Sequence, residues 1–250
     1  MDREKIIKNL LEAGKRLADA PPEKIITFTD NNEADALLNN LNEYPHAFVL
    51  ACIMDRQVRA ERAWLIPYEF SKELGGFEFS RLLELKQEKV TRIFQNKKLH
   101  RFNDVMAKNF YAGIRRIHEN YQDDASKIWE NNPPSAAIVR SFLEFDGVGV
   151  KIATMAANIL AREFKMPMKD RICIDISPDV QVKKVFIRLG LLSKEASNEQ
   201  LIYLCRELNP QYPGIFDLPA WKIGRQWCKP KNPECQNCYL NEYCQKNLRS

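Results

Sequence analysis

The stretch that decides the fold runs from Ser135 to Leu160 and reads SAAIVRSFLEFDGVGVKIATMAANIL. Two apolar, helix-forming segments flank a corner in which Gly147 and Gly149 bracket Val148. Glycine allows positive φ and close backbone approach, and the second helix begins directly after the corner. The N–H groups of its first turn would face outward and could bind a phosphate without reading bases. An ordinary helical hairpin with a glycine corner fits the same pattern, so the corner alone leaves both interpretations open.

Lys151 follows these glycines and lies in the first turn of an otherwise apolar helix. The helix dipole disfavours a cation there and so favours the neutral amine, which is the nucleophilic form of lysine. A surface lysine that contacts phosphate would also fit the position. Further along, Asp179 follows Pro178 where a helix should begin, and there an aspartate is commonly an N-cap. If a functional carboxylate lies here, Asp175 is the competing candidate.

Four of the seven cysteines lie in one segment, CKPKNPECQNCYLNEYC, near the end of the sequence. Their spacing, C-x6-C-x2-C-x5-C, contains one tight pair, whereas structural zinc sites usually combine two. A cubane iron–sulfur cluster takes four thiolates from one compact loop, and disulfides are unexpected in a reducing compartment. The spacing therefore indicates a metal centre and leaves zinc and iron–sulfur open. Its ligands would be Cys228, Cys235, Cys238 and Cys244.

The remaining sequence is a succession of helix-forming segments separated by turn signals such as GG at 75–76, NNPP at 131–134 and NPQYPG at 209–214. Apolar residues recur at helical spacing in stretches near 2–18, 33–42, 46–56, 60–74, 79–85, 104–120, 135–145, 150–163, 179–189 and 197–207. No alternating run makes a convincing strand. We therefore predict an all-α class.

Composition excludes several classes of protein. The 250 residues are 45% hydrophobic, enough for one large or two modest domains, and the formal net charge of +5 is compatible with a polyanionic partner. The first twenty residues carry acids and bases at helical spacing, without the apolar core of a signal peptide. The longest apolar run, Ala47 to Met54, is too short to cross a bilayer. We expect a cytoplasmic, nucleoid-associated protein without membrane contact.

A run of basic residues supports a polyanionic partner. Nine lysines or arginines lie between Lys86 and Arg116, and only Glu88 and Asp104 oppose them. A solvated helical face is the alternative interpretation of such a run.

Three blocks together resemble one known family. FDGVGVKIA, at 145–153, is similar to the Leu-Pro-Gly-Val-Gly-x-Lys-x-Ala hairpin of the helix–hairpin–helix DNA glycosylase superfamily. PDVQVKKV, at 178–185, resembles its apolar-Asp-x-x-Val-x-Arg-Val block. The cysteine spacing is that of its endonuclease III branch, in which the four thiolates hold a [4Fe–4S] cluster. The resemblance covers about residues 45–244, and the three blocks occur in the family's order.

The resemblance implies roles for individual residues. Lys151 falls on the catalytic lysine, which attacks the sugar C1′, expels the damaged base and forms a Schiff base. Asp179 falls on the catalytic aspartate. Gln57 falls on the glutamine that fills the gap left by a flipped base. Gly147, Val148 and Gly149 would bind the DNA backbone, and the basic cluster loop would add Lys229 and Lys231.

The chain departs from the family pattern at three places. Asp55 and Val58 stand where the family has Ser and Thr, so an aspartate near the lesion could accept a hydrogen bond from a base amino group. Asp146 replaces the hairpin proline. The segment between Lys151 and Asp179 is longer than usual, which puts the placement of Asp179 in question.

The implied architecture has two helical domains with the active-site cleft between them. One domain would span 43–163 and include the helix–hairpin–helix at 135–163. The other would combine 1–42 with 164–250 and carry the cluster loop at 228–244.

The function implied is that of a base-excision-repair DNA glycosylase, bifunctional through an AP lyase activity at Lys151. Its partner would be double-stranded DNA containing a damaged or mismatched base, bound by a monomer. Two alternatives stay open. One is a monofunctional glycosylase of the same superfamily with an atypical base specificity, and the other is a non-catalytic DNA-binding iron–sulfur protein.

Overall fold

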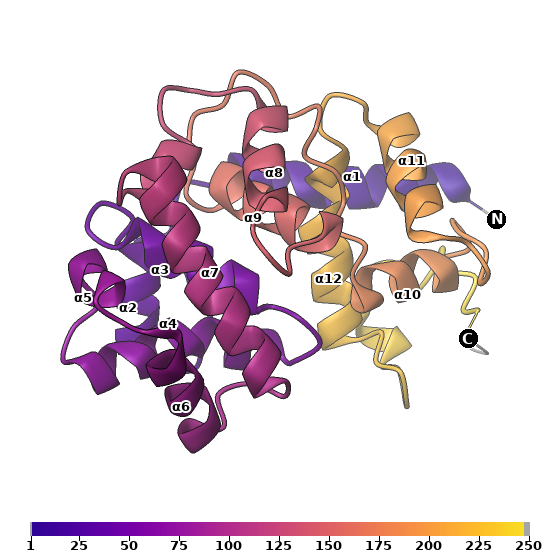
Figure 1. Ribbon diagram of the computed structural model, residues 1–250. Helices are drawn as coiled ribbons and strands as arrows, with labels where there is room; N and C mark the ends of the chain where they lie inside the picture. The colour runs from indigo at the N-terminus through magenta and orange to yellow at the C-terminus, as the bar shows by residue number, and fades with distance from the viewer. Residues whose placement is uncertain (1, 248–250) are drawn as a thin grey trace. The chain divides into compact units, whose positions relative to one another are not determined.

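The structure is a computed structural model that describes residues 2–247 (Figure 1). Within these residues the chain forms α-helices and short 3-10 helices and no strand, which confirms the all-α class. The chain divides into two compact units. The first comprises Met1–Pro22, Pro134–Val139 and Ala157–Ser250, and the second comprises Glu23–Pro133 and Arg140–Ala156.

These units differ from the two domains expected from the sequence. There, one domain spanned 43–163 and the other combined 1–42 with 164–250. Residues 23–42 lie in the second unit, whereas residues 134–139 and 157–163 lie in the first. The two hairpin helices therefore each contribute to both units. The domain assignment itself stays a prediction.

The core of the second unit is built around α3 (Pro45–Met54). Every residue of this helix is buried, and it packs against α4 (Ala60–Leu74) and α7 (Asn103–Tyr121). A Cβ on Gly113 of α7 would lie 2.9 Å from Ile53 Cδ1, so glycine lets α7 approach α3 closely. The other helices of this unit are α2 (Asn32–Asn39), α5 (Phe79–Leu83), α6 (Gln87–Lys97) and η1 (Ala125–Ile128).

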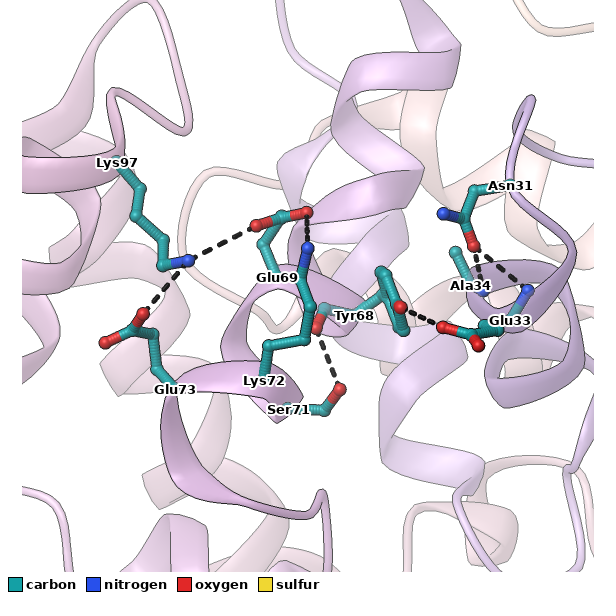
Figure 2. Close-up of polar contacts among 9 residues, drawn as sticks. All are labelled: Asn31, Glu33, Ala34, Tyr68, Glu69, Ser71, Lys72, Glu73 and Lys97. Carbon is teal, nitrogen blue, oxygen red and sulfur yellow. Dashed lines mark hydrogen bonds and ion pairs between the residues drawn. The ribbon is translucent and has the colours of Figure 1, made fainter.

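Polar contacts join three helices at the surface of this unit, as Figure 2 shows. Tyr68 of α4 donates a hydrogen bond to Glu33 of α2. Lys97, at the end of α6, forms ion pairs with Glu69 at 3.4 Å and Glu73 at 3.0 Å, both on α4. Ion pairs near a protein surface stabilise a fold only slightly, so the main effect of these contacts is to orient the side chains.

In the first unit, α10 (Val180–Arg188) packs against α12 (Asp217–Gln226) (Figure 1). A Cβ on Gly224 of α12 would lie 2.9 Å from Gln181 Cβ, so this glycine brings the two helices together. The unit also contains α1 (Arg3–Asp19), α11 (Asn198–Leu208), η2 (Pro213–Phe216) and η3 (Cys235–Asn237).

The long segment between α9 and α10 is an ordered loop. Ile174 and Ile176 are buried in it. The Ile174 carbonyl accepts from Gly214 N–H at 2.7 Å, and Ser177 N–H donates to Asp217 Oδ1 at 2.9 Å. These bonds lead the chain to the start of α10 along a defined path.

Most helices lie within a few residues of the predicted bounds, but α6 and α12 were missed. Helix α6 falls inside the basic run and buries only Val90, Ile93 and Phe94. Helix α12 carries Pro219 in its first turn, where proline's missing N–H costs no helical bond. No helix within residues 2–247 has the length and apolar character needed to cross a membrane.

Candidate active site and cysteine centre

The predicted hairpin joins α8 (Ser135–Leu143) to α9 (Val150–Arg162) (Figure 1). Gly147 adopts φ of +82°, which favours glycine, and a Cβ there would lie 2.1 Å from Asn109 Nδ2, so that side chain would have to shift. Val148 N–H donates to the Phe145 carbonyl at 3.1 Å and closes the turn. Around Gly149 no atom lies within 4 Å of the position that a Cβ would take. The turn thus leaves open space beside the first turn of α9.

Lys151 lies in the first turn of α9, as predicted, and its ammonium contacts a carboxylate. Nζ lies 2.8 Å from Asp55 Oδ2 and 3.4 Å from the Asp55 carbonyl. Asp55 is the C-cap of α3, and only 6% of it is exposed, whereas Lys151 is half-buried. The sequence singled out Asp55 as a departure from the family but did not predict that it pairs with the lysine.

The surroundings of this ion pair disfavour an isolated charge. Cys52, one turn back on α3, is fully buried. Burial raises the pKa of its thiol well above the ordinary value, and the negative charge of Asp55 raises it further while Lys151 opposes it. In such surroundings each member of the Lys151–Asp55 pair stabilises the charge of the other.

Gln57 lies in the loop after α3, in the same unit as Lys151. It is exposed and adopts φ of +55°, which is uncommon for a residue with a side chain. Beneath the loop lies His100, 2% exposed, whose Nδ1 accepts from Phe102 N–H at 3.0 Å. Its Nε2 is buried without a well-aligned hydrogen bond. Burial lowers the pKa of His100, and the backbone carbonyls of Met54 and Arg56 oppose this shift. The sequence had not identified His100 as a support for this loop.

Asp179 lies in the first unit and is the N-cap of α10, where its Oδ1 accepts from Gln181 N–H at 2.8 Å. The N-cap that its position predicted is therefore present. Asp175, the competing carboxylate, accepts two hydrogen bonds from Arg206 at 2.7 Å each and is buried. This bidentate pair explains Asp175 as a structural residue.

The four tail cysteines line a single cavity of about 30 Å³ in the first unit. Burial raises the pKa of the Cys238 and Cys244 thiols, and the neighbouring cysteines raise it further. Four thiolates at this cavity would repel one another unless a cationic group compensated them. Within residues 2–247 no three His, Cys, Asp or Glu side chains surround one point closely enough to hold a single metal ion. The four cysteines that line the cavity stay the candidate ligands of the predicted metal centre.

Arg188 on α10 organises the same cavity. It is 2% exposed and lines the cavity beside the cysteines. Its Nη1 donates to the carbonyls of Lys229 at 2.7 Å and Cys228 at 3.3 Å, and lies 3.5 Å from Cys228 Sγ. Its Nε is buried without a hydrogen-bond partner, as expected for a donor that faces an anionic group at this site. No local sequence pattern indicated this role.

The predicted basic contacts fall into two groups. Within the run from Lys86 to Arg116, Lys97 is paired with acids of α4, and Arg116 is paired with Glu144 at 3.2 Å. In the cysteine loop, Lys229 and Lys231 are exposed, and Lys229 forms an ion pair with Glu234. Part of the predicted positive surface is therefore neutralised within the protein.

Comparisons with known proteins find relatives of this chain that are named endonuclease III. No protein-family model matches it. It is 28% identical to endonuclease III of Thermotoga maritima over 107 residues, 43% of this chain and 46% of that protein. It is 26% identical to endonuclease III of Rickettsia felis over 170 residues, 66% of this chain and 67% of that protein. The chain thus matches under half the length of the Thermotoga relative.

Solved structures extend the likeness of fold to the whole chain. A trapped endonuclease III–DNA covalent intermediate is similar with a TM-score of 0.67 and 15% identity, covering 100% of this chain and 99% of that one. A thermostable thymine-DNA glycosylase is similar with a TM-score of 0.63 and 16% identity, covering 99% of both chains. At these identities the structural likeness concerns the fold.

Proposed function

We propose that this chain, which belongs to the helix–hairpin–helix DNA glycosylase superfamily, is a base-excision DNA glycosylase that also cleaves the abasic site through a Schiff base at Lys151. The observation that carries the proposal is the position of Lys151. It follows the open space beside Gly149 at the hairpin, lies in the first turn of α9, and touches a buried carboxylate at 2.8 Å. A lysine held in this way is an oriented amine rather than a mobile surface cation.

In the proposed reaction the neutral amine of Lys151 attacks C1′ of the damaged nucleotide. The C1′–Nζ bond forms as the glycosidic bond breaks, and the base leaves with that bond's electron pair and takes up a proton. Loss of the remaining proton from the amine and opening of the sugar ring give the Schiff base. Removal of a C2′ proton then expels the 3′ phosphate and nicks the strand.

Two further groups would assist this chemistry. The sugar develops oxocarbenium character as the base departs, and we assign Asp179 as the carboxylate that stabilises it. Gln57, on its exposed loop, would occupy the gap that the flipped base leaves in the duplex.

The same proposal assigns the DNA contacts. The hairpin residues Gly147, Val148 and Gly149 would hold one phosphate at the start of α9. Exposed Lys229 and Lys231 would meet the backbone at a second place. Both contacts ignore base identity, so a monomer could bind any stretch of chromosomal DNA in the cytoplasm and search it for lesions.

We assign a [4Fe–4S] cluster to the cavity lined by Cys228, Cys235, Cys238 and Cys244. The buried Arg188 guanidinium and its unpaired Nε support this assignment, because a cluster held by four thiolates is anionic. When bound, the cluster would fix the shape of a basic loop. The residues of the loop would then orient Lys229 and Lys231 toward DNA.

Borohydride trapping on a panel of duplexes tests the proposal. The panel contains an abasic site, thymine glycol, uracil opposite guanine, 8-oxoguanine, hypoxanthine and an alkylated purine. We expect a covalent protein–DNA adduct with the abasic duplex and with at least one lesion. Lys151→Ala should abolish it, whereas Lys8→Ala, which changes an exposed lysine of α1, should not.

Two results would contradict the proposal in different ways. Base release without any adduct would identify a monofunctional glycosylase. Binding to DNA with neither base release nor adduct would identify a non-catalytic DNA-binding protein.

A further inference from the structure

The carboxylate beside Lys151 is built into the core rather than placed on the surface. Asp55 ends α3, whose ten residues are all buried, and its N–H donates to the Cys52 carbonyl at 3.1 Å. Its side chain is 7% exposed, and its Oδ2 lies 2.8 Å from Lys151 Nζ. This distance is that of a charge-assisted hydrogen bond, along which a proton can pass between the two groups.

Burying a carboxylate is costly, so its position calls for an explanation. A lysine that only contacted phosphate would gain nothing from an anion at its ammonium, because the anion would weaken its attraction to the phosphate. A lysine that acts as a nucleophile must lose a proton, and Asp55 Oδ2 already lies in contact with the atom that loses it.

We propose that Asp55 is the general base for Lys151, which rests on the proposed function above. As the Nζ lone pair forms the bond to C1′, one proton passes from Nζ to Oδ2 of Asp55. The glycosidic electron pair leaves with the base, or, on an abasic site, the carbonyl π electrons move to oxygen. The protonated Asp55 can then return its proton to the departing hydroxyl of the carbinolamine.

This role predicts a distinctive pH dependence. A proton that passes from Lys151 Nζ to Asp55 Oδ2 stays within the pair, so this step does not consume hydroxide. The rate of adduct formation should therefore be flat from about pH 7 to 9. Without Asp55 the ammonium must lose its proton to solvent, and the rate should rise about tenfold per pH unit over the lower part of that range.

Other ionisable groups near the pair in this unit do not titrate in that range. Cys52 on α3 has its pKa raised well above 9.0 by burial. His100, under the loop, has its pKa lowered by burial. A slope that appears between about pH 7 and 9 would therefore report the Lys151–Asp55 pair.

The test is the single-turnover rate of cyanoborohydride trapping on abasic DNA for wild type, Asp55→Asn and Asp55→Ser. We expect a roughly 10²-fold lower rate for both variants at pH 7 and a deficit that shrinks as pH rises. Asp30→Asn, which changes an exposed aspartate of the same unit, should match wild type at each pH. Circular dichroism identifies a variant that fails to fold. In that case the pH dependence of the other Asp55 variant tests the inference.

A rate lowered by the same factor at every pH would assign Asp55 a structural role and overturn the inference. An unchanged rate would overturn it as well. If wild type forms no adduct at any pH, the proposed function fails instead, and the two failures are thereby distinguished.

Discussion

His46 illustrates how single buried residues set the response of this protein to pH. It is 2% exposed, its Nε2–H donates to the Phe77 carbonyl at 2.6 Å, and its ring stacks on Phe77 at 5.2 Å. Burial lowers its pKa from 6.5 to about 4, against the opposing effect of the Phe77 carbonyl. The folded chain therefore keeps His46 neutral under mildly acidic conditions, whereas the unfolded chain protonates it.

The sign of the effect follows from proton uptake. Between pH 6.5 and about 4 the unfolded state binds more protons at this site, so the free energy of unfolding falls as pH falls. The variant His46→Gln keeps a donor for the Phe77 carbonyl but does not titrate. We predict that, between pH 7 and pH 5, its free energy of unfolding falls by about 2 kcal/mol less than that of wild type. Urea unfolding at the two pH values measures it. His118→Gln, at an exposed position, is the control, and equal losses in wild type and His46→Gln would refute the prediction.

Residues of the candidate site could be predicted only where they belong to a local sequence pattern. The position of Lys151 after two glycines is a local pattern, and so is the N-cap position of Asp179. The contact between Lys151 and Asp55 joins residues 96 positions apart, so nothing in either neighbourhood predicts it. From the sequence, Asp55 could accept a hydrogen bond from a base amino group, and the structure adds that it contacts Lys151.

Helix α10 connects two candidate site regions of the first unit. Its N-cap is Asp179, and its last residue is Arg188, which binds the backbone of the cysteine loop at Cys228 and Lys229. This helix was predicted from its apolar periodicity and its proline–aspartate start. The role of Arg188 was not, because a charged residue at the end of a helix is usually explained by the helix dipole.

We predict that Arg188→Met weakens the proposed cluster centre. The substitution keeps an apolar stem but leaves the carbonyls of Cys228, Lys229 and Pro230 without their donor, at a cost of about 2–3 kcal/mol. Iron content per chain and the visible absorbance of the purified protein should fall well below wild type, and the midpoint of thermal unfolding should drop. Arg225→Met, which changes an exposed arginine of α12, should retain its iron. Wild-type iron content in Arg188→Met would show that Arg188 does not support the site.

The two missed helices mark where periodicity alone gives too little signal. Helix α6 presents three buried residues among charges, and α12 contains both a proline and a glycine. Helix α6 packs against α7, and α12 packs against α10. Tertiary contacts of this kind stabilise short helices and cannot be seen in a short segment of sequence.

At the level of the whole molecule, helical periodicity along the chain predicted the all-α class, and three short blocks predicted the family resemblance. The sequence did not predict which residues belong to which compact unit. Residues 134–139 and 157–163 belong to a different unit from the rest of their hairpin, and this assignment depends on tertiary packing. Nor did the net charge of +5 reveal that part of the basic run is neutralised by acids within the fold.

The central claim is that Lys151 becomes covalently bonded to DNA. The most direct test is to trap the wild-type protein on an abasic duplex with borohydride, digest the adduct with nuclease and trypsin, and locate the sugar remnant by mass spectrometry. Modified Lys151 resists trypsin, so we predict the remnant on the uncleaved peptide Ser141–Arg162. Lys184 is the competing amine, because burial lowers its pKa. A remnant on Lys184, or on any amine other than Lys151, would contradict the account.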